Sequence, residues 1–181
     1  MGEVNERIYT MRDIEALPQG QRAELIEGHI YRMGAPKRVH QMISMAISAI
    51  VFNHIQDEKL SCEAYAAPFG VWPFGDESTY LELDFVVVCD KDKLDDDGCK
   101  GAPDFVIEIA SPSDTKEVMR RKFQIYHRAG VKEYWVIHPS ERTVLTYVFE
   151  PELMSDYYTT SEDIPVNIFP GFTMNLAKLG L

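Results

Sequence analysis

An apolar run, an amphipathic segment and a second apolar run follow one another in the middle of the chain. Residues 105–110 and 132–138 have the length and the β-branched and aromatic content of buried strands. Residues 114–129 repeat apolar side chains at helical spacing. Ser113 or Asp114 is expected to cap the start of this helix, and Gly130 stands where a left-handed cap would end it. Because a strand reached through a helical crossover normally runs parallel to its predecessor, this pattern predicts a sheet with a helix packed on it.

The rest of the chain adds a hairpin, a second long helix and further strands. A short helix is predicted at 10–17, a hairpin turn at Glu27-Gly28, and a long helix at 40–58, where apolar side chains share one face. Additional strands are predicted at 62–72, 80–89 and 143–149. The predicted fold class is therefore α/β (α+β): a mixed β-sheet flanked by two long helices, with an N-terminal β-hairpin.

The length of the chain, 181 residues of which 45% are hydrophobic, suits a single domain, 1–181. Within it we expect an N-terminal helix and hairpin at 1–39, a core at 40–138, and a C-terminal strand and extension at 139–181. Polar residues interrupt the most apolar stretch, 40–55, so no membrane span is expected. The first residues lack the apolar segment of a secretion signal, which favours a cytoplasmic location.

Three further expectations come from the cysteines, a charged segment and the net charge. Cys62, Cys89 and Cys99 cannot all pair within one chain and lack the spacing of a zinc site, so reduced thiols are expected. Residues 90–101 hold five aspartates and little to bury, which predicts a mobile surface loop. The net charge of -11 opposes long-range attraction to phosphate, so tight non-specific binding of DNA is not expected.

Two acidic residues stand inside apolar strands. Alternation along the strands places Asp84 on a face with Val86, and Glu108 on a face with Val106. A buried carboxylate either takes up a proton or finds a cation, so two of them on neighbouring strands predict a site for a divalent metal. The alternative is that each acid ends its strand in solvent or pairs with an arginine.

A lysine on the predicted helix 114–129 is the third element of this site. Lys122 lies four residues after Val118 and four before Tyr126, on the edge of the buried face. Such a lysine usually extends into solvent, but beside two carboxylates it could stabilise a phosphoryl-transfer transition state or orient the attacking water. We expect its ammonium within about 4 to 5 Å of Glu108 or Asp84, and we expect a Lys122→Met protein to fold.

Several segments together closely resemble the Uma2 family of putative restriction endonucleases, a branch of the PD-(D/E)XK nuclease superfamily. They are LELDFVVV, PDFVIEIASPSD, KFQIYHRAGVKEYWVIHP, and AELIEGHIYRMGAP followed by His40. The resemblance covers about residues 9–147 and implies a restriction-endonuclease-like core of αβββαβ order. It also implies Mg²⁺ or Mn²⁺ held by Asp84 and Glu108, and hydrolysis of phosphodiester bonds in nucleic acid, with DNA favoured, by a metal-activated water.

Two features depart from the superfamily pattern. The lysine that normally stands two residues after the strand glutamate is replaced by Ala110, and the resemblance moves this role to Lys122. The proline of the first motif is absent before Asp84 and stands instead before Asp104. Asp104 and Glu108 would lie roughly 13 Å apart along one strand, too far to share an ion, so Asp104 is placed at the strand entrance.

Other residues are weaker candidates for the site. Glu24 matches an early acid of the family and could orient a water, or it is an exposed hairpin acid. His40 could reach the site or a phosphate, or it is a surface residue at a helix start. Tyr126 is expected to pack and to hold Lys122 through its hydroxyl. Three arginines of the predicted helix could contact phosphates, but a solvent-exposed helix face is the favoured interpretation; they are Arg120, Arg121 and Arg128.

Three functions remain open at this point. The first is an active DNA endonuclease, the second a catalytically weak nuclease-fold module that binds nucleic acid or a protein partner, and the third a hydrolase of small phosphodiesters. Cleavage of plasmid DNA with Mg²⁺ or Mn²⁺ would separate the first from the others. A homodimer suits the first, and an apolar cluster offers an interface for it: Tyr147, Phe149, Tyr157 and Tyr158.

Overall fold

The computed structural model describes residues 7–111 and 114–179, and a six-stranded mixed sheet forms its centre. The strand order is β12 (Met154–Thr159), β11 (Thr143–Val148), β10 (Glu133–His138), β9 (Phe105–Ile109), β6 (Phe85–Val88), β3 (Glu63–Ala66). Strands β9 and β10 run parallel, joined by helix α3 (Lys116–Ala129), and the other neighbours run antiparallel. The predicted crossover unit is confirmed.

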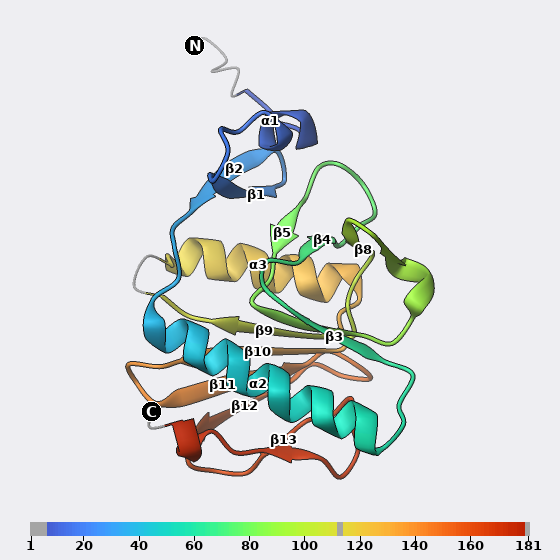
Figure 1. Cartoon of the computed structure of the whole chain (residues 1–181), viewed down its shortest axis with the longest axis vertical. Coiled ribbons are helices and arrows are strands. Elements are labelled where there is room, and N and C mark those ends of the chain that lie inside the picture. Colours follow the sequence, from blue (N-terminus) through green and yellow to red (C-terminus); the bar gives the residue numbers. More distant parts are fainter. Residues whose placement is uncertain (1–6, 112–113, 180–181) are drawn as a thin grey trace.

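Two apolar layers cover the two faces of this sheet (Figure 1). Helix α2 (Arg38–Asp57) and the C-terminal segment pack on one face, where α2 buries Ile43, Ile47, Val51 and Ile55. The C-terminal segment contains β13 (Ile164–Pro165), β14 (Thr173–Met174) and η2 (Ala177–Leu179). The other face is covered by α3 and by a four-stranded sheet of order β5 (Leu81–Glu82), β4 (Gly70–Trp72), β8 (Gly98–Lys100), β7 (Leu94–Asp95).

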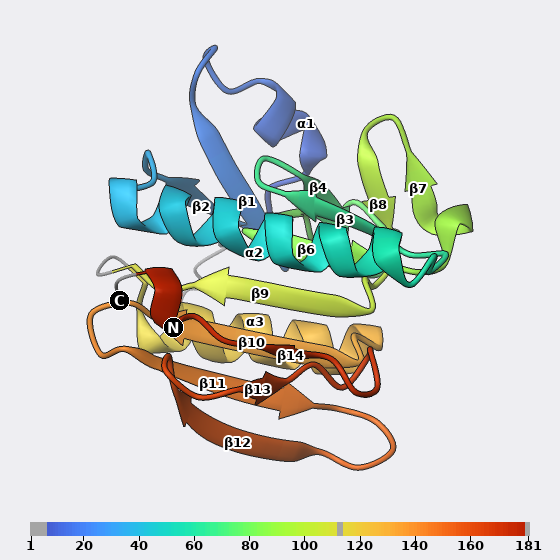
Figure 2. The ribbon, with the colours of Figure 1, turned by 60° about the horizontal axis from the view of Figure 1, so that its bottom comes forward.

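The predicted N-terminal hairpin is confirmed. Strands β1 (Arg22–Ile26) and β2 (His29–Met33) pair around Glu27 and Gly28, whose φ values of 48° and 81° are those of a tight left-handed turn. A short helix, α1 (Met11–Glu15), precedes them. The hairpin joins the rest of the molecule through a bridge between Leu25 and Tyr80, and Figure 2 shows it at the edge opposite β12.

Two predicted strands are each divided into two. The predicted strand 80–89 breaks at Leu83 and Asp84 into β5 and β6, so Leu83 enters the core under α3 on the same side as Val86. The simple alternation expected there is wrong, because the chain changes sheets at the break. Residues 62–72 divide likewise into β3 and β4, on either side of Pro68, which has no N–H for a ladder hydrogen bond. Strand β12 was not expected, since its side chains are almost all exposed and show no apolar alternation.

The expectation of a mobile loop at 90–101 is wrong. The segment forms the 3-10 helix η1 (Lys91–Lys93) and the hairpin β7–β8, and β8 pairs with β4 and buries Cys99. One Asp95 oxygen accepts hydrogen bonds from the backbone N–H groups of Asp97 and Gly98 at 2.9 and 3.0 Å. The aspartates are therefore used to hold a turn, a local role that their charge alone did not reveal.

The expectation of reduced cysteines is also wrong for two of the three. Cys62 and Cys89 form a disulfide, while Cys99 is free and buried. In the β3–β6 register Glu63 stands opposite Val88, so the next pair outward is Cys62 and Cys89. Strand pairing thus brings together two residues that are 27 positions apart in the chain.

Two smaller expectations need correction. Helix α3 is capped by Thr115, whose hydroxyl accepts from Val118 N–H at 3.2 Å, whereas Asp114 accepts from Ser111 N–H; Ser113 lies outside the described residues.

The proposed aromatic interface is not one exposed cluster. Of its members, Tyr147 and Phe149 pack with the α3 side of the sheet, Tyr158 packs with the α2 side, and Tyr157 is 66% exposed. Among the described residues, no helix is long and apolar enough to span a membrane.

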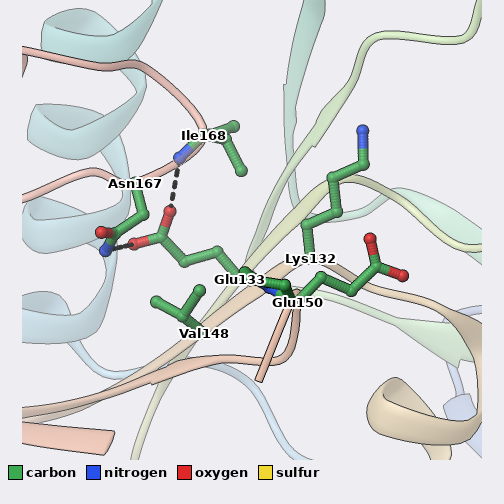
Figure 3. A pocket seen from close by; sticks show the side chains of 7 residues that line it. Lys132, Glu133, Val148, Glu150, Asn167 and Ile168 are labelled. Carbon is green, nitrogen blue, oxygen red and sulfur yellow. Dashed lines mark hydrogen bonds between the residues drawn. The ribbon is translucent and has the colours of Figure 1, made fainter. Parts of the chain in front are cut away.

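A buried carboxylate anchors the C-terminal segment to the sheet. Glu133 of β10 accepts hydrogen bonds from Asn167 Nδ2 at 3.2 Å and from Ile168 N–H at 2.9 Å (Figure 3). It also accepts one from Trp135 Nε1 at 2.8 Å. Burial raises the pKa of Glu133, and these hydrogen bonds oppose that shift. Glu133 also lines a surface depression of about 580 Å³, at the start of β10.

We predict that Glu133→Gln lowers the free energy of unfolding by about 1 to 3 kcal/mol. The NH2 group of glutamine would replace one acceptor oxygen and would then face an N–H donor without a hydrogen bond. Since the pKa of Glu133 is raised on folding, its contribution to stability is present below the ordinary value and is lost as the pH rises through the raised value. The deficit of the variant should therefore be larger at pH 5 than at pH 8. Urea unfolding at both pH values measures it, with exposed Glu141→Gln as control. A variant as stable as the control would contradict this role.

Candidate active site

The two predicted metal-binding acids lie at the edge where the pairing of β6 with β9 ends. In this pairing Phe85 stands opposite Ile107, so the next residues along the register are Asp84 and Glu108. The Oδ2 atom of Asp84 accepts a hydrogen bond of 2.8 Å from Ile109 N–H, which fixes the aspartate beside the end of β9. Strand pairing therefore brings the two acids to neighbouring positions.

Glu108 is held by two donors from α3. Its Oε1 atom accepts from Lys122 Nζ at 3.0 Å and from the Tyr126 hydroxyl at 2.6 Å. Lys122 also donates to Glu24 Oε1 at 2.9 Å, so one ammonium joins β9, α3 and the hairpin strand β1. All four side chains are buried. The expected approach of Lys122 to Glu108 is confirmed. The expectation that the Tyr126 hydroxyl holds the lysine is wrong, because this hydroxyl donates to Glu108.

The charges in this cluster depend on one another. Burial raises the pKa of Glu108, and the adjacent Lys122 ammonium opposes that rise. Burial would lower the pKa of Lys122, but Glu108 and Glu24 raise it above its ordinary value, so the ammonium stays charged. Burial also raises the pKa of Tyr126, which keeps its hydroxyl protonated as a donor.

His40 reaches the same place from the other face of the sheet. It lies in the first turn of α2, and its Nε2 is 3.1 Å from Asp84 Oδ1. The hydrogen bond to Asp84 raises the pKa of His40, burial opposes the rise, and the charges of Asp84, Glu108 and Asp114 add to it. The Nδ1 atom of His40 is buried and has no hydrogen-bond partner among the described residues. Of the weaker candidates, Glu24, His40 and Tyr126 therefore all lie at this site.

The donor set fits a hard cation that keeps much of its hydration. In the part of the chain that the structure describes, no three His, Cys, Asp or Glu side chains form a cage for a metal. Mg²⁺ commonly binds through only one or two carboxylates, with water and substrate phosphate as its other ligands. The described hydrogen bonds of the Glu108 side chain all go to Oε1, which leaves Oε2 for an ion. Asp84 would be the second ligand.

The remaining sequence candidates lie elsewhere. Asp104 precedes β9 at its other end, where it pairs with Lys132 at 2.7 Å and accepts from Cys89 N–H, so its exclusion from the site is confirmed. Arg121 and Arg128 form ion pairs with Glu27 of the hairpin turn, and Arg120 is exposed.

Asp114 was expected only as a helix cap, and its electrostatic effect on the site was missed. Its charge contributes to the raised pKa of His40, which places it near the cluster. Its position between β9 and α3 is the one signal that could have indicated this, because both elements carry site residues.

The sequence profile of a known family matches most of the chain. The family is Uma2, described as "Putative restriction endonuclease", and the match covers residues 10–177. The chain belongs to the Uma2 family. No curated protein matches this Uma2 chain.

A solved structure shows the same fold as this Uma2 protein. It is described as a putative nuclease belonging to DUF820 from Anabaena variabilis ATCC 29413, with a TM-score of 0.74 and 21% sequence identity. The match covers 94% of this chain and 96% of the other. The mixed α+β, nuclease-like fold expected for the Uma2 chain is therefore shown.

The shared ammonium changes the expectation for Lys122→Met. Removing it would leave two buried carboxylates without their cation, so we now predict a loss of about 3 to 5 kcal/mol in the free energy of unfolding at neutral pH. The double variant Lys122→Met/Glu24→Gln has one fewer unpaired charge and should recover part of the loss. Urea unfolding of both proteins measures this. Wild-type stability in Lys122→Met would show that the pairs contribute nothing.

Proposed function

We propose that this Uma2 protein is a metal-dependent endonuclease that hydrolyses phosphodiester bonds in DNA, with Mg²⁺ or Mn²⁺ held by Asp84 and Glu108. One observation supports this most directly: the two acids occupy neighbouring positions at the end of β6–β9 pairing, and Lys122 lies 3.0 Å from Glu108. The membership of the family supports the nuclease class. The superfamily pattern has a lysine two residues after the strand glutamate, but this chain has Ala110 at that position. In our proposal Lys122 supplies the cation from α3 instead.

The metal ion and the residues of the protein would have separate roles at this site. A bound divalent cation would supply Lewis-acid stabilisation of the phosphate and a lowered pKa of water. Lys122, whose ammonium is fixed by two carboxylates, would face the negative charge that develops on the phosphate in the transition state. Because its position is set before substrate binds, no reorganisation is needed during the reaction.

Three further residues would act on these groups. Tyr126 fixes Oε1 of Glu108 through its hydroxyl, which orients the other carboxylate oxygen. Glu24 holds Lys122 from the opposite side. His40 would orient Asp84 and, when protonated, would offer positive charge to a phosphate beside it.

The oligomeric state belongs to the same proposal. A homodimer would let two such sites act on the two strands of a duplex. Sedimentation velocity with and without DNA tests this part separately from catalysis.

We predict that Asp84→Asn and Glu108→Gln each abolish Mg²⁺- or Mn²⁺-dependent cleavage of supercoiled plasmid DNA. Each change removes a charged ligand, so metal affinity should fall by more than the roughly tenfold that loss of an outer-shell partner costs. Isothermal titration with Mn²⁺ and plasmid nicking measure the two effects. The matched control is Asp104→Asn, which alters a carboxylate at the other end of β9 and should keep metal affinity. Cleavage by the Glu108→Gln protein would exclude this site, whereas wild-type protein that binds DNA and cuts none would favour the binding module.

We predict that Lys122→Met lowers kcat by about a hundredfold or more while Mn²⁺ affinity is retained or increased, because a repelling charge is removed from the metal site. The assay is run at a temperature where circular dichroism shows the variant folded. Glu24→Gln is the matched control, since it disturbs the same cluster but keeps the ammonium. Full activity in the folded Lys122→Met protein would contradict this role of the ammonium.

A further inference from the structure

One long segment of this acidic chain carries no acidic residue. The protein has 29 aspartates and glutamates and a net charge of -11, yet residues 28–56 include none of them. The same segment carries the cations Arg32, Lys37 and Arg38. It comprises β2, the connection after it and nearly all of α2. Charge is therefore distributed unevenly along the chain.

This segment passes directly beside the candidate active site. Lys37 and Arg38 begin α2, and His40, two residues later, contacts Asp84 at 3.1 Å. Both cations are exposed, and neither has a salt bridge with any residue that the structure describes. Arg32 donates to the neutral side chain of Gln21 at 2.8 Å and also lacks a carboxylate partner within the described ranges. Its charge is therefore not neutralised by a neighbour.

Helix stability does not explain these cations. The start of a helix carries a partial positive charge and favours acidic residues, but the first turn of α2 has none and begins with Lys37 and Arg38. The side chain of Lys37 forms no capping hydrogen bond. The arrangement thus costs the free protein some stability and would be favourable only beside an anion.

The outer face of α2 continues this surface without charge. Met45 and Phe52 are 75% and 52% exposed. They follow Arg38 at intervals of seven residues, which is about two helical turns, so the three side chains lie on one face of the helix. The view in Figure 1 shows α2 lying across the sheet along its whole length. We call this surface the β2–α2 face and define it by Arg32, Lys37, Arg38, Met45 and Phe52.

We propose that the β2–α2 face binds the nucleic-acid backbone on one side of the phosphate that is cleaved. The inference rests on the proposed nuclease function and names a substrate-binding surface for the same site. Charge complementarity supports it, because Lys37 and Arg38 can neutralise phosphates from a segment that carries no acidic residue of its own, whereas acids are abundant in the rest of the sequence. Met45 and Phe52 would contact sugars or bases farther along the strand.

The salt dependence of DNA binding tests this surface. Binding of a fluorescein-labelled DNA duplex is measured by anisotropy over a range of NaCl concentrations, with Ca²⁺ in place of Mg²⁺. Each neutralised phosphate contributes about 0.9 to the slope of log Kobs against log [NaCl], so the slope of Lys37→Gln/Arg38→Gln should be smaller by about 1.8. The matched control is Lys59→Gln/Lys91→Gln, which removes the same charge beyond the ends of α2 and β6 and should leave the slope unchanged.

Three results would overturn the proposal. They are an unchanged slope in Lys37→Gln/Arg38→Gln, an equal change in the control pair, and wild-type protein that does not bind the duplex. A Met45→Ser/Phe52→Ser protein, examined by sedimentation velocity, gives a further test. Expected are unchanged mass and weaker DNA binding; loss of an oligomer with unchanged DNA binding would mean that a second copy covers this face.

Failure of the proposed function would look different. Wild-type protein that binds the duplex with the expected slope change but cuts no DNA with Mg²⁺ or Mn²⁺ would leave the β2–α2 face intact and exclude the nuclease. Cleavage of DNA by wild-type protein, together with an unchanged slope in Lys37→Gln/Arg38→Gln, would support the nuclease and exclude the β2–α2 face.

Discussion

The ion pairs of Lys122 with Glu108 and Glu24 are the interaction on which the site depends. Strand β1, which is distant in sequence, meets the consecutive elements β9 and α3 at one ammonium, with separations of 2.9 and 3.0 Å. Buried carboxylates are costly when unpaired, so the cluster holds together only while this cation is present. The same arrangement fixes a positive charge beside Glu108. Stability and the proposed chemistry therefore draw on one group, which is why a change at Lys122 has to be examined for both.

The site forms where regular strand pairing stops. The β6–β9 ladder ends at Phe85 and Ile107, and Asp84 then uses its carboxylate, in place of its backbone, to bond Ile109 N–H. The end of a sheet is open to side chains from both covering layers. His40 comes from α2 and Lys122 from α3, so groups from opposite faces of the sheet meet where the pairing of β6 with β9 ends. A substrate could approach this edge without disturbing either apolar core.

The large negative charge of the chain is distributed among distinct structural roles. Asp95 holds a turn in the segment that was expected to be mobile, Glu133 anchors the C-terminal segment, and Asp104 pairs with Lys132. These acids are used locally and lie outside the site. The acid-free stretch 28–56, from β2 through nearly all of α2, borders the site instead. The net charge alone is thus a poor guide to whether a polyanion could bind, because its distribution decides the local field.

The sequence by itself determined the crossover unit, the N-terminal hairpin and the location of Asp84 and Glu108 in apolar strand segments. It could do so because helical and strand periodicities are local properties of the chain. It also indicated Lys122 as a candidate, because this lysine stands on the edge of an apolar helix face and the family resemblance assigns it the role of the missing lysine. Only the tertiary structure decided which groups meet. The pairing of Lys122 with Glu24, the Cys62–Cys89 disulfide and the break of the predicted strand at Asp84 all follow from register and from which sheet a segment joins. These are long-range choices, and no local pattern encodes them.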